Sequence, residues 1–129
     1  MAVMYCDHIH LKAGDVEKTA NWYRDYLGGE ITYRGQFRES PVVYVTFGGF
    51  NLVIYGRLHT DTDVLPAASA PRFGIDHFGF RVENLTAVIE VLRGKGVPIL
   101  EEPVTVRQGV HMAYIEGPER VRIELVQRD

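Results

Sequence analysis

Two histidines of this chain stand at matching positions in two similar stretches of sequence, and an aspartate precedes each of them. Asp7 and His8 belong to the stretch CDHIH, and Asp76 and His77 belong to IDHFGF, at an offset of 76 − 7 = 69 residues. A third residue of a metal-binding type, Glu124, lies in the stretch VRIELVQ. Two imidazoles and one carboxylate are a known ligand set for a divalent transition metal, and they leave positions open for substrate, oxygen or water. We therefore predict that His8, His77 and Glu124 bind a metal ion.

Apolar and polar residues alternate around all three candidate ligands, which is the pattern of a strand with one buried face. In the first stretch Ile9 and Leu11 fall on one face and are predicted to lie under a helix, so His8 falls on the other face. The face turned away from the helices is predicted to carry His8, His10, His77, Arg81, Arg122 and Glu124. If two such sheets curl together, these side chains line one concave cleft.

Each half of the chain contains the signals of one helix followed by three strands. Asp15 and Asn84 are predicted to cap the starts of two helices, because their side chains accept hydrogen bonds from free backbone N–H groups. Apolar residues then recur at helical spacing, and Gly28 in the first half, with Gly94 and Gly96 in the second, indicates the stops. Strands are predicted at about 30–36, 41–48, 50–56, 97–105, 109–116 and 120–127.

This internal repeat predicts an α+β fold built from two tandem βαβββ modules that form a cleft-lined, barrel-like mixed sheet. Two four-stranded modules leave open sheet edges, which are usually covered, so we expect a homodimer. The sequence leaves open whether the modules pair within one chain or across a swapped dimer. We predict one domain over residues 1–129, with the first module at 1–56, a linker at 57–73 and the second module at 74–129.

The composition argues against several classes of partner. Hydrophobic residues make up 46% of the chain and charged residues 24%, as in ordinary soluble domains. The net charge is −3 and there is no run of lysine or arginine, so we expect no nucleic-acid partner. No stretch approaches the roughly 20 apolar residues of a membrane span, so we expect no membrane partner. The single cysteine excludes an internal disulfide, and the first residues lack a signal-peptide pattern, so a cytoplasmic location is expected.

Three features of the chain together resemble the vicinal oxygen chelate superfamily, the group of glyoxalases, bleomycin-resistance proteins and extradiol dioxygenases. They are the βαβββ repeat, the segment DVEKTANWYRDYLG and the ending YIEGPERVRIEL. The resemblance covers nearly the whole chain. It implies metal ligands on the first and last strand of each module, at His8, Val53, His77 and Glu124. It also implies a divalent metal ion (Fe, Mn, Ni, Co or Zn) as cofactor and a small-molecule substrate.

Val53 departs from part of this family. Glyoxalase and epimerase relatives have a glutamate or glutamine there, whereas a valine can neither bind a metal nor accept a proton. Three ligands instead resemble the extradiol dioxygenases, which carry a tyrosine ten residues before the glutamate, where Tyr114 stands (124 − 114 = 10). Those enzymes also have a histidine at the place of Thr105, so this match is partial. Fosfomycin-resistance transferases share the ligand count but have phosphate-binding serines at the places of Gln108 and Met112.

The resemblance implies a divalent-metal-dependent enzyme that chelates a small vicinal-oxygen substrate, and a glyoxalase-like or epimerase-like lyase or isomerase is the leading hypothesis. A ring-cleaving, extradiol-type dioxygenase with a two-His-one-Glu site is the first alternative, because of the ligand count. A metal-free, drug-sequestering resistance protein is the second, although such relatives lack the histidine and glutamate ligands present here.

Further side chains are predicted to act beside the metal. Tyr114 and His10 are expected to supply protons, and Glu124 is expected to act in catalysis as well as in metal binding. His111 has the opposite strand parity to Tyr114 and is predicted to be structural. The residues expected to contact the substrate are Arg81 and Arg122, which can hold a carboxylate, and Val53 and Met112.

Overall fold

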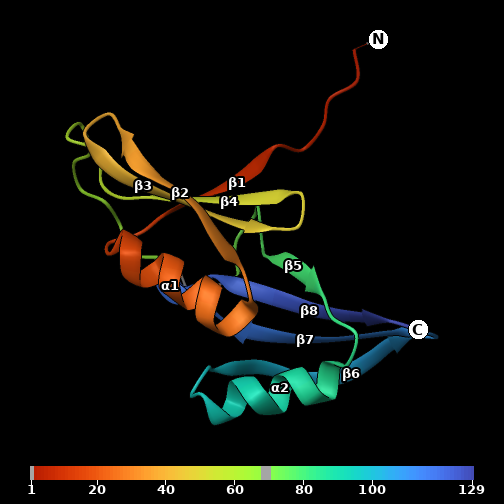
Figure 1. Cartoon of the computed structure of the whole chain (residues 1–129). Coiled ribbons are helices and arrows are strands. Elements are labelled where there is room, and N and C mark those ends of the chain that lie inside the picture. Colours follow the sequence, from red (N-terminus) through yellow and green to blue (C-terminus); the bar gives the residue numbers. More distant parts are fainter. Residues whose placement is uncertain (1, 68–70) are drawn as a thin grey trace. The chain divides into compact units, whose positions relative to one another are not determined.

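The fold was examined in a computed structural model, which describes residues 2–67 and 71–129 (Figure 1). Three residues of the predicted linker, 68–70, lie outside the described residues. The chain runs strand, helix and three strands, and then repeats that order. The elements are β1 (His8–Lys12), α1 (Val16–Leu27), β2 (Glu30–Phe37), β3 (Ser40–Phe47), β4 (Phe50–Tyr55), β5 (Phe78–Arg81), α2 (Leu85–Gly94), β6 (Ile99–Arg107), β7 (Val110–Glu116), a short 3₁₀ turn (Pro118–Arg120) and β8 (Arg122–Arg128).

The predicted α+β fold of two βαβββ modules is confirmed, and each predicted strand end lies within two residues of the observed one. The chain divides into two compact units, residues 1–65 and 66–129, and each holds one module. The grouping of both modules into one domain stays a prediction.

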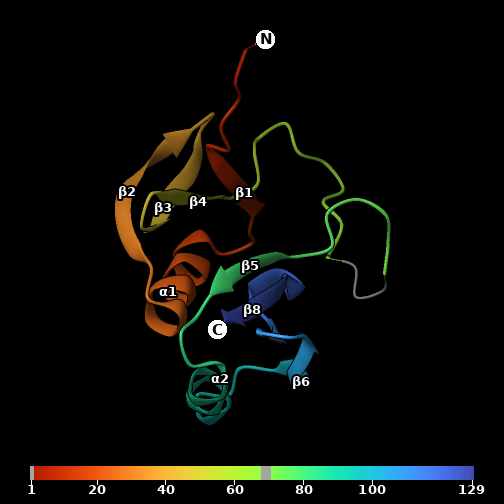
Figure 2. The same cartoon turned by 90° about the vertical axis from the view of Figure 1, so that its right-hand side faces the viewer.

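The first unit is a four-stranded sheet with α1 against one of its faces (Figures 1 and 2). The strand order is β1-β4-β3-β2, in which β1 runs parallel to β4 and the other neighbours are antiparallel. Asp15 caps α1 by accepting a hydrogen bond of 3.0 Å from the backbone N–H of Lys18. Gly28 ends the helix with a left-handed backbone, φ 78°, which favours glycine.

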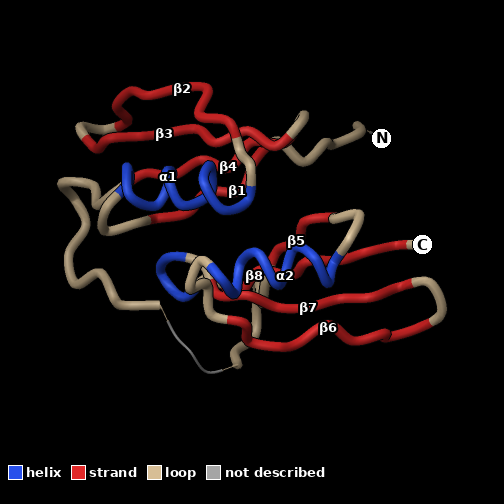
Figure 3. The backbone as a smooth tube through the Cα atoms, turned by 60° about the horizontal axis from the view of Figure 1, so that its bottom comes forward, coloured by secondary structure: helices blue, strands red, loops and turns tan. Residues whose placement is uncertain are grey.

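The second unit repeats this arrangement with the order β5-β8-β7-β6 and with α2 against one face (Figure 3). Asn84 caps α2 through a bond of 3.1 Å from the N–H of Ala87. Gly94 was predicted to stop this helix, but it is the last helical residue, and the left-handed residue that follows is Gly96, φ 82°.

The helix-covered face of each sheet is the core. In the first unit it holds the fully buried Val45, Leu52 and Ile54, and in the second unit Ile115 and Ile123. Because strand residues alternate between faces, the residues between these point to the uncovered face. The two sheets match in register there: His10 lies beside Val53, and Gly79 lies beside Glu124.

Candidate functional site

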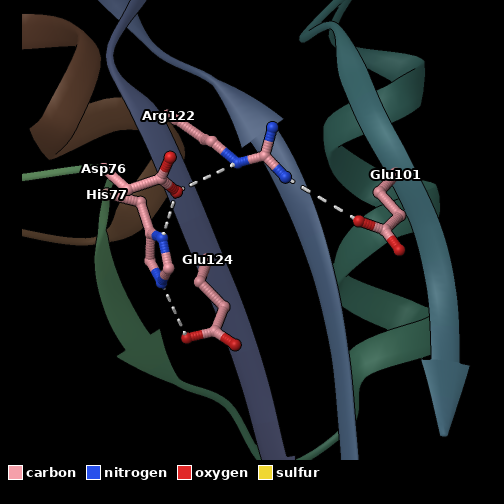
Figure 4. Close-up of polar contacts among 5 residues, drawn as sticks. All are labelled: Asp76, His77, Glu101, Arg122 and Glu124. Carbon is pink, nitrogen blue, oxygen red and sulfur yellow. Dashed lines mark hydrogen bonds and ion pairs between the residues drawn. The ribbon is translucent and has the colours of Figure 1, made fainter. Parts of the chain in front are cut away.

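The uncovered face of the second unit brings together two of the predicted metal ligands (Figure 4). His77 directly precedes β5, and Glu124 lies in β8, the strand that pairs with β5. Nε2 of His77 is 3.5 Å from Oε2 of Glu124. Their side chains are 29% and 25% exposed, so both are shielded by the sheet and still reachable from solvent.

Gly79 provides the space in which the Glu124 carboxylate lies. The two residues are register partners on β5 and β8. A Cβ atom at position 79 would stand 3.2 Å from Oε2 of Glu124, which is tighter than normal van der Waals contact. The missing side chain thus lets this carboxylate extend across β5 toward His77.

Asp76 binds the other side of the His77 ring. Its Oδ2 is 2.7 Å from Nδ1 of His77. A carboxylate only accepts hydrogen bonds, so this contact places a ring proton on Nδ1, while Nε2 faces Glu124. Sequence reasoning assigned no role to Asp76, although the repeated Asp-His pair is the signal from which one could be found.

Arg122 lies against the ring of Tyr114 and between two carboxylates. Its guanidinium carbon is 3.9 Å from the centre of the Tyr114 ring. Nε is 3.7 Å from Oδ2 of Asp76, and Nη2 is 3.8 Å from Oε2 of Glu101 (Figure 4). Arg122, predicted to contact the substrate, is therefore also part of the surroundings of His77.

Tyr114 stands at the centre of this group. It is the register partner of Glu124 across β7 and β8, and its ring centre is 5.0 Å from that of His77. Burial, followed by the negative charge of Glu124, raises the pKa of the Tyr114 hydroxyl, and Arg122 partly offsets the rise. The phenol therefore stays protonated at neutral pH and can donate a proton.

The other two predicted substrate contacts of this unit lie on the same face. Met112 is two residues before Tyr114 on β7 and pairs with Val126 of β8. Arg81 also pairs with Val126, from β5, and is exposed. These positions border the group formed by His77, Glu124 and Tyr114.

The first unit carries the remaining candidates. His8 is 47% exposed, and its Nδ1 is 2.7 Å from Oδ2 of Asp7, the same contact as in the second unit. His10 is stacked on Tyr55 with ring centres 3.4 Å apart. Burial, and then the charges of Lys12 and His8, lowers the pKa of His10, which favours its neutral form.

Val53, 6% exposed, is buried beside His10, in the position that Glu124 occupies in the other sheet. It therefore has an apolar side chain where the second unit has its carboxylate.

The donor atoms of the second unit suit a shared metal ion. With metal–nitrogen and metal–oxygen bonds of about 2.0–2.2 Å, two ligand atoms of one ion lie about 3–3.5 Å apart, and the His77–Glu124 distance falls at the upper end of that range. Within residues 2–67 and 71–129, no group of three or more His, Cys, Asp or Glu side chains is close enough to hold a metal ion. The third predicted ligand, His8, belongs to the first unit.

His111 lies apart from this group and has structural partners. Its Nδ1 is hydrogen-bonded to the hydroxyl of Thr105 at 2.8 Å, and its Nε2 to the carboxylate of Asp129 at 2.8 Å. Both ring nitrogens are occupied, which agrees with the structural role predicted from its parity.

Neither α1, with 12 residues, nor α2, with 10, is long enough for a membrane span, and no other described helix qualifies.

The chain was compared with known proteins. The family model of the Glyoxalase/Bleomycin resistance protein/Dioxygenase superfamily matches residues 5–125. A protein of Synechocystis sp. named "Probable lactoylglutathione lyase" is 26% identical over an alignment of 129 positions that covers 96% of this chain and 95% of that protein. Plant relatives are longer, and the chain spans 35% to 43% of their length.

The solved structures that resemble this chain include glyoxalase family proteins. A glyoxalase family protein from Enterococcus faecalis is 26% identical, with a TM-score of 0.76 over 95% of this chain and 97% of that one. A glyoxalase family protein from Bacillus cereus has a TM-score of 0.85 over 99% of this chain and 96% of that one. Its identity is 14%, so this likeness shows the fold alone.

Proposed function

The chain belongs to the glyoxalase/bleomycin resistance protein/dioxygenase superfamily, as its sequence indicated, and from this membership we propose that it is a divalent-metal-dependent lyase or isomerase. The proposed substrate is a small molecule that offers two neighbouring oxygens. The name lactoylglutathione lyase, given to a relative that matches over nearly its full length, supports a lyase of this kind.

The observation that carries the proposal is the approach of His77 and Glu124. Nε2 and Oε2 are 3.5 Å apart, and Asp76 binds Nδ1 on the far side of the ring. We propose His8 as the third ligand, contributed by the first unit of the same chain or of a partner subunit. The ion is Fe, Mn, Ni, Co or Zn.

The protein side chains then have separate tasks. A bound divalent ion supplies Lewis-acid polarisation of the substrate oxygens. The protonated Tyr114 hydroxyl donates a proton to the substrate, and the neutral His10 accepts or returns one. Glu124, the register partner of Tyr114, acts in catalysis in addition to holding the ion. Arg81 and Arg122 bind a negatively charged group of the substrate, and Val53 and Met112 provide apolar contacts.

A second candidate function, a ring-cleaving extradiol-type dioxygenase, is favoured by two observations. Val53 leaves the ligand number at three, and Tyr114 stands beside His77 and Glu124. An Fe(II) site with open positions suits a catechol and oxygen. Cleavage of catechols by the Fe(II)-loaded protein in air, without activity on lactoylglutathione, would favour this function.

The proposal is tested by metal analysis combined with activity. The full chain is loaded with Fe(II), Mn(II), Ni(II), Co(II) or Zn(II), and tightly held metal per chain is measured by elemental analysis. Each loaded form is assayed with lactoylglutathione, a panel of 2-hydroxycarbonyl compounds and catechols. About one metal ion per site with activity on a vicinal-oxygen compound is expected. Protein that holds no metal after loading would contradict the proposal and favour a drug-sequestering protein.

Two variants locate the site. Glu124→Ala removes one of three ligands and is expected to abolish metal retention. His111→Ala serves as the control, because its partners Thr105 and Asp129 lie away from the ligands. Equal metal retention in both variants would contradict the ligand assignment. We also propose that the active form is a cytoplasmic homodimer.

A further inference from the structure

The same carboxylate contact is present behind both predicted histidine ligands. Asp7 Oδ2 lies 2.7 Å from His8 Nδ1, and Asp76 Oδ2 lies 2.7 Å from His77 Nδ1. The two pairs are 69 residues apart, at equivalent places of the repeat. If the two contacts were chance surface contacts, the same atoms at the same distance would not be expected in both halves of the chain.

We propose that Asp7 and Asp76 are positioning residues, each holding the histidine that follows it with Nδ1 protonated and Nε2 turned outward as the metal-binding atom. This inference rests on the metal-dependent function proposed above. A free imidazole exchanges its proton between the two nitrogens and rotates about its side-chain bonds. A carboxylate on Nδ1 removes both freedoms, which orients the ring and makes Nε2 a better ligand.

The two pairs differ in how firmly the carboxylate itself is held. Asp76, 59% exposed, has a further neighbour in the Arg122 cation, whose Nε is 3.7 Å from its Oδ2. Arg122 is in turn placed by Tyr114 and by Glu101. Figure 4 shows this order of contacts, from Glu101 through Arg122 and Asp76 to His77 and Glu124.

Asp7 is 87% exposed, and its one polar partner within the part of the chain that the structure describes is His8. The second pair is therefore held in place before metal arrives, and the first pair is held less firmly. Arg122 acts as a further positioning residue, because it holds Asp76 in place.

The test uses the full chain and Zn(II) as the probe. Long-range ¹H–¹⁵N NMR spectra at pH 8 report which ring nitrogen of each histidine carries the proton, before and after Zn(II) is added. Competition with a chelator gives the Zn(II) affinity. The variants are Asp76→Asn, Asp7→Asn and Arg122→Gln. An asparagine keeps the size of the side chain but replaces the charged acceptor with a neutral amide, which can turn either its oxygen or its NH₂ toward Nδ1 and so no longer fixes one tautomer.

Asp76→Asn is expected to reduce the Nδ1-protonated signal of His77 and to weaken Zn(II) binding by about 10- to 100-fold. Asp7→Asn is expected to act in the same way on His8 with a smaller loss. Arg122→Gln is expected to weaken Zn(II) binding by less than Asp76→Asn does. The matched control is Asp129→Asn, which breaks the equivalent carboxylate contact to His111, 2.8 Å long, and should leave Zn(II) affinity unchanged. Melting temperatures identify any variant that fails to fold.

Parent protein that binds Zn(II), together with an Asp76→Asn variant of unchanged tautomer and affinity, would overturn the positioning role and leave the metal function standing. Parent protein that binds neither Zn(II) nor any of the other four ions would overturn the proposed metal function. In that case the NMR signals still show whether the aspartates set the tautomers, so the two failures are distinguished.

Discussion

The guanidinium carbon of Arg122 lies 3.9 Å from the centre of the Tyr114 ring, so a cation covers one face of the residue proposed to donate a proton. The two side chains come from neighbouring strands, β8 and β7. The contact restricts the ring, which lies beside His77 with ring centres 5.0 Å apart and pairs in register with Glu124.

The substitution Tyr114→Phe separates the packing of the ring against Arg122 from proton donation by the hydroxyl. The variant keeps the ring under Arg122 and removes only the hydroxyl, so folding and metal retention should be preserved. If the hydroxyl supplies a proton, kcat should fall by about 10²- to 10⁴-fold with little change in metal affinity. Steady-state kinetics of the metal-loaded variant measure the effect. A kcat equal to that of the parent would exclude Tyr114 as the proton donor.

Gly79→Ala should weaken metal binding without weakening the fold. The added Cβ would stand 3.2 Å from Oε2 of Glu124 and push the carboxylate away by a few tenths of an ångström. The metal affinity is expected to fall several-fold while the melting temperature stays the same or rises, because alanine restricts the unfolded chain. Gly49→Ala, where a Cβ meets nothing within 4 Å, is the control. Unchanged metal affinity in Gly79→Ala would show that the space over Gly79 does not contribute to metal binding.

Val53→Glu should add a fourth protein ligand. It is expected to tighten metal retention and to weaken binding of a bidentate probe such as a catechol or a hydroxamate, because one open position is then taken. Spectra of the Co(II)-loaded protein, titrated with the probe, measure the change. A spectrum of the parent that no chelator shifts, or a variant identical to the parent in both properties, would reject the idea.

Val53→Glu also affects stability, and the melting temperature measures this effect. Val53 is 6% exposed, and a glutamate there that does not reach a metal is a buried, unpaired charge that lowers stability. Val53→Met keeps the site uncharged and is the control for size. A loss of melting temperature confined to metal-free Val53→Glu, and reversed by metal, is the expected result.

The Lys12–Asp61 ion pair should make stability depend on acid pH. Hydrogen bonds from Lys12 and then from the backbone N–H of Leu58 lower the pKa of Asp61. A lowered folded-state pKa stabilises the protein above the unfolded value of about 3.9, and this contribution is lost as the pH falls through the folded-state pKa. Asp61→Asn should therefore lower the melting temperature at pH 7, with a gap that closes below about pH 3.9. The exposed Asp63, replaced in the same way, should give little change at either pH.

A homodimer is expected because of the outer strands. Within its sheet, β1 pairs only with β4, and β5 pairs only with β8. Large apolar side chains precede both strands, among them Tyr5 at 86% and Ile75 at 85% exposure. Edges and apolar residues of this kind are usually covered. Sedimentation should give twice the chain mass, and a stable, metal-loaded monomer would contradict the prediction.

Much of the fold could be predicted because its signals are local. The caps at Asp15 and Asn84 and the glycine at 28 mark helix ends through contacts within a few residues. Alternation along β8 separates the buried Ile123 and Leu125 from Glu124. The repeat then supplied the order of elements, since each half carries the same signals. Gly94 was misplaced because a glycine at a helix end can be its last residue as well as its stop.

The sequence by itself determined which residues share the uncovered face, because strand periodicity decides that residue by residue. It identified His77, Glu124 and Arg122 as members of that face, and the family resemblance added Tyr114, ten residues before Glu124. It did not determine which side chains touch, since contact between β5, β7 and β8 depends on the register that the whole sheet sets.

Only the tertiary structure decided those contacts. It placed Tyr114 opposite Glu124, opened the space over Gly79 for the carboxylate, and put Arg122 beside Asp76. It also stacked His10 on Tyr55, although β1 and β4 are distant in the sequence. The paired residues His10 and Val53 of these strands are 43 residues apart. The physical reason is the same in each case: hydrogen bonds between strands distant in the chain fix which side chains are neighbours, and no local pattern of residue types carries that information.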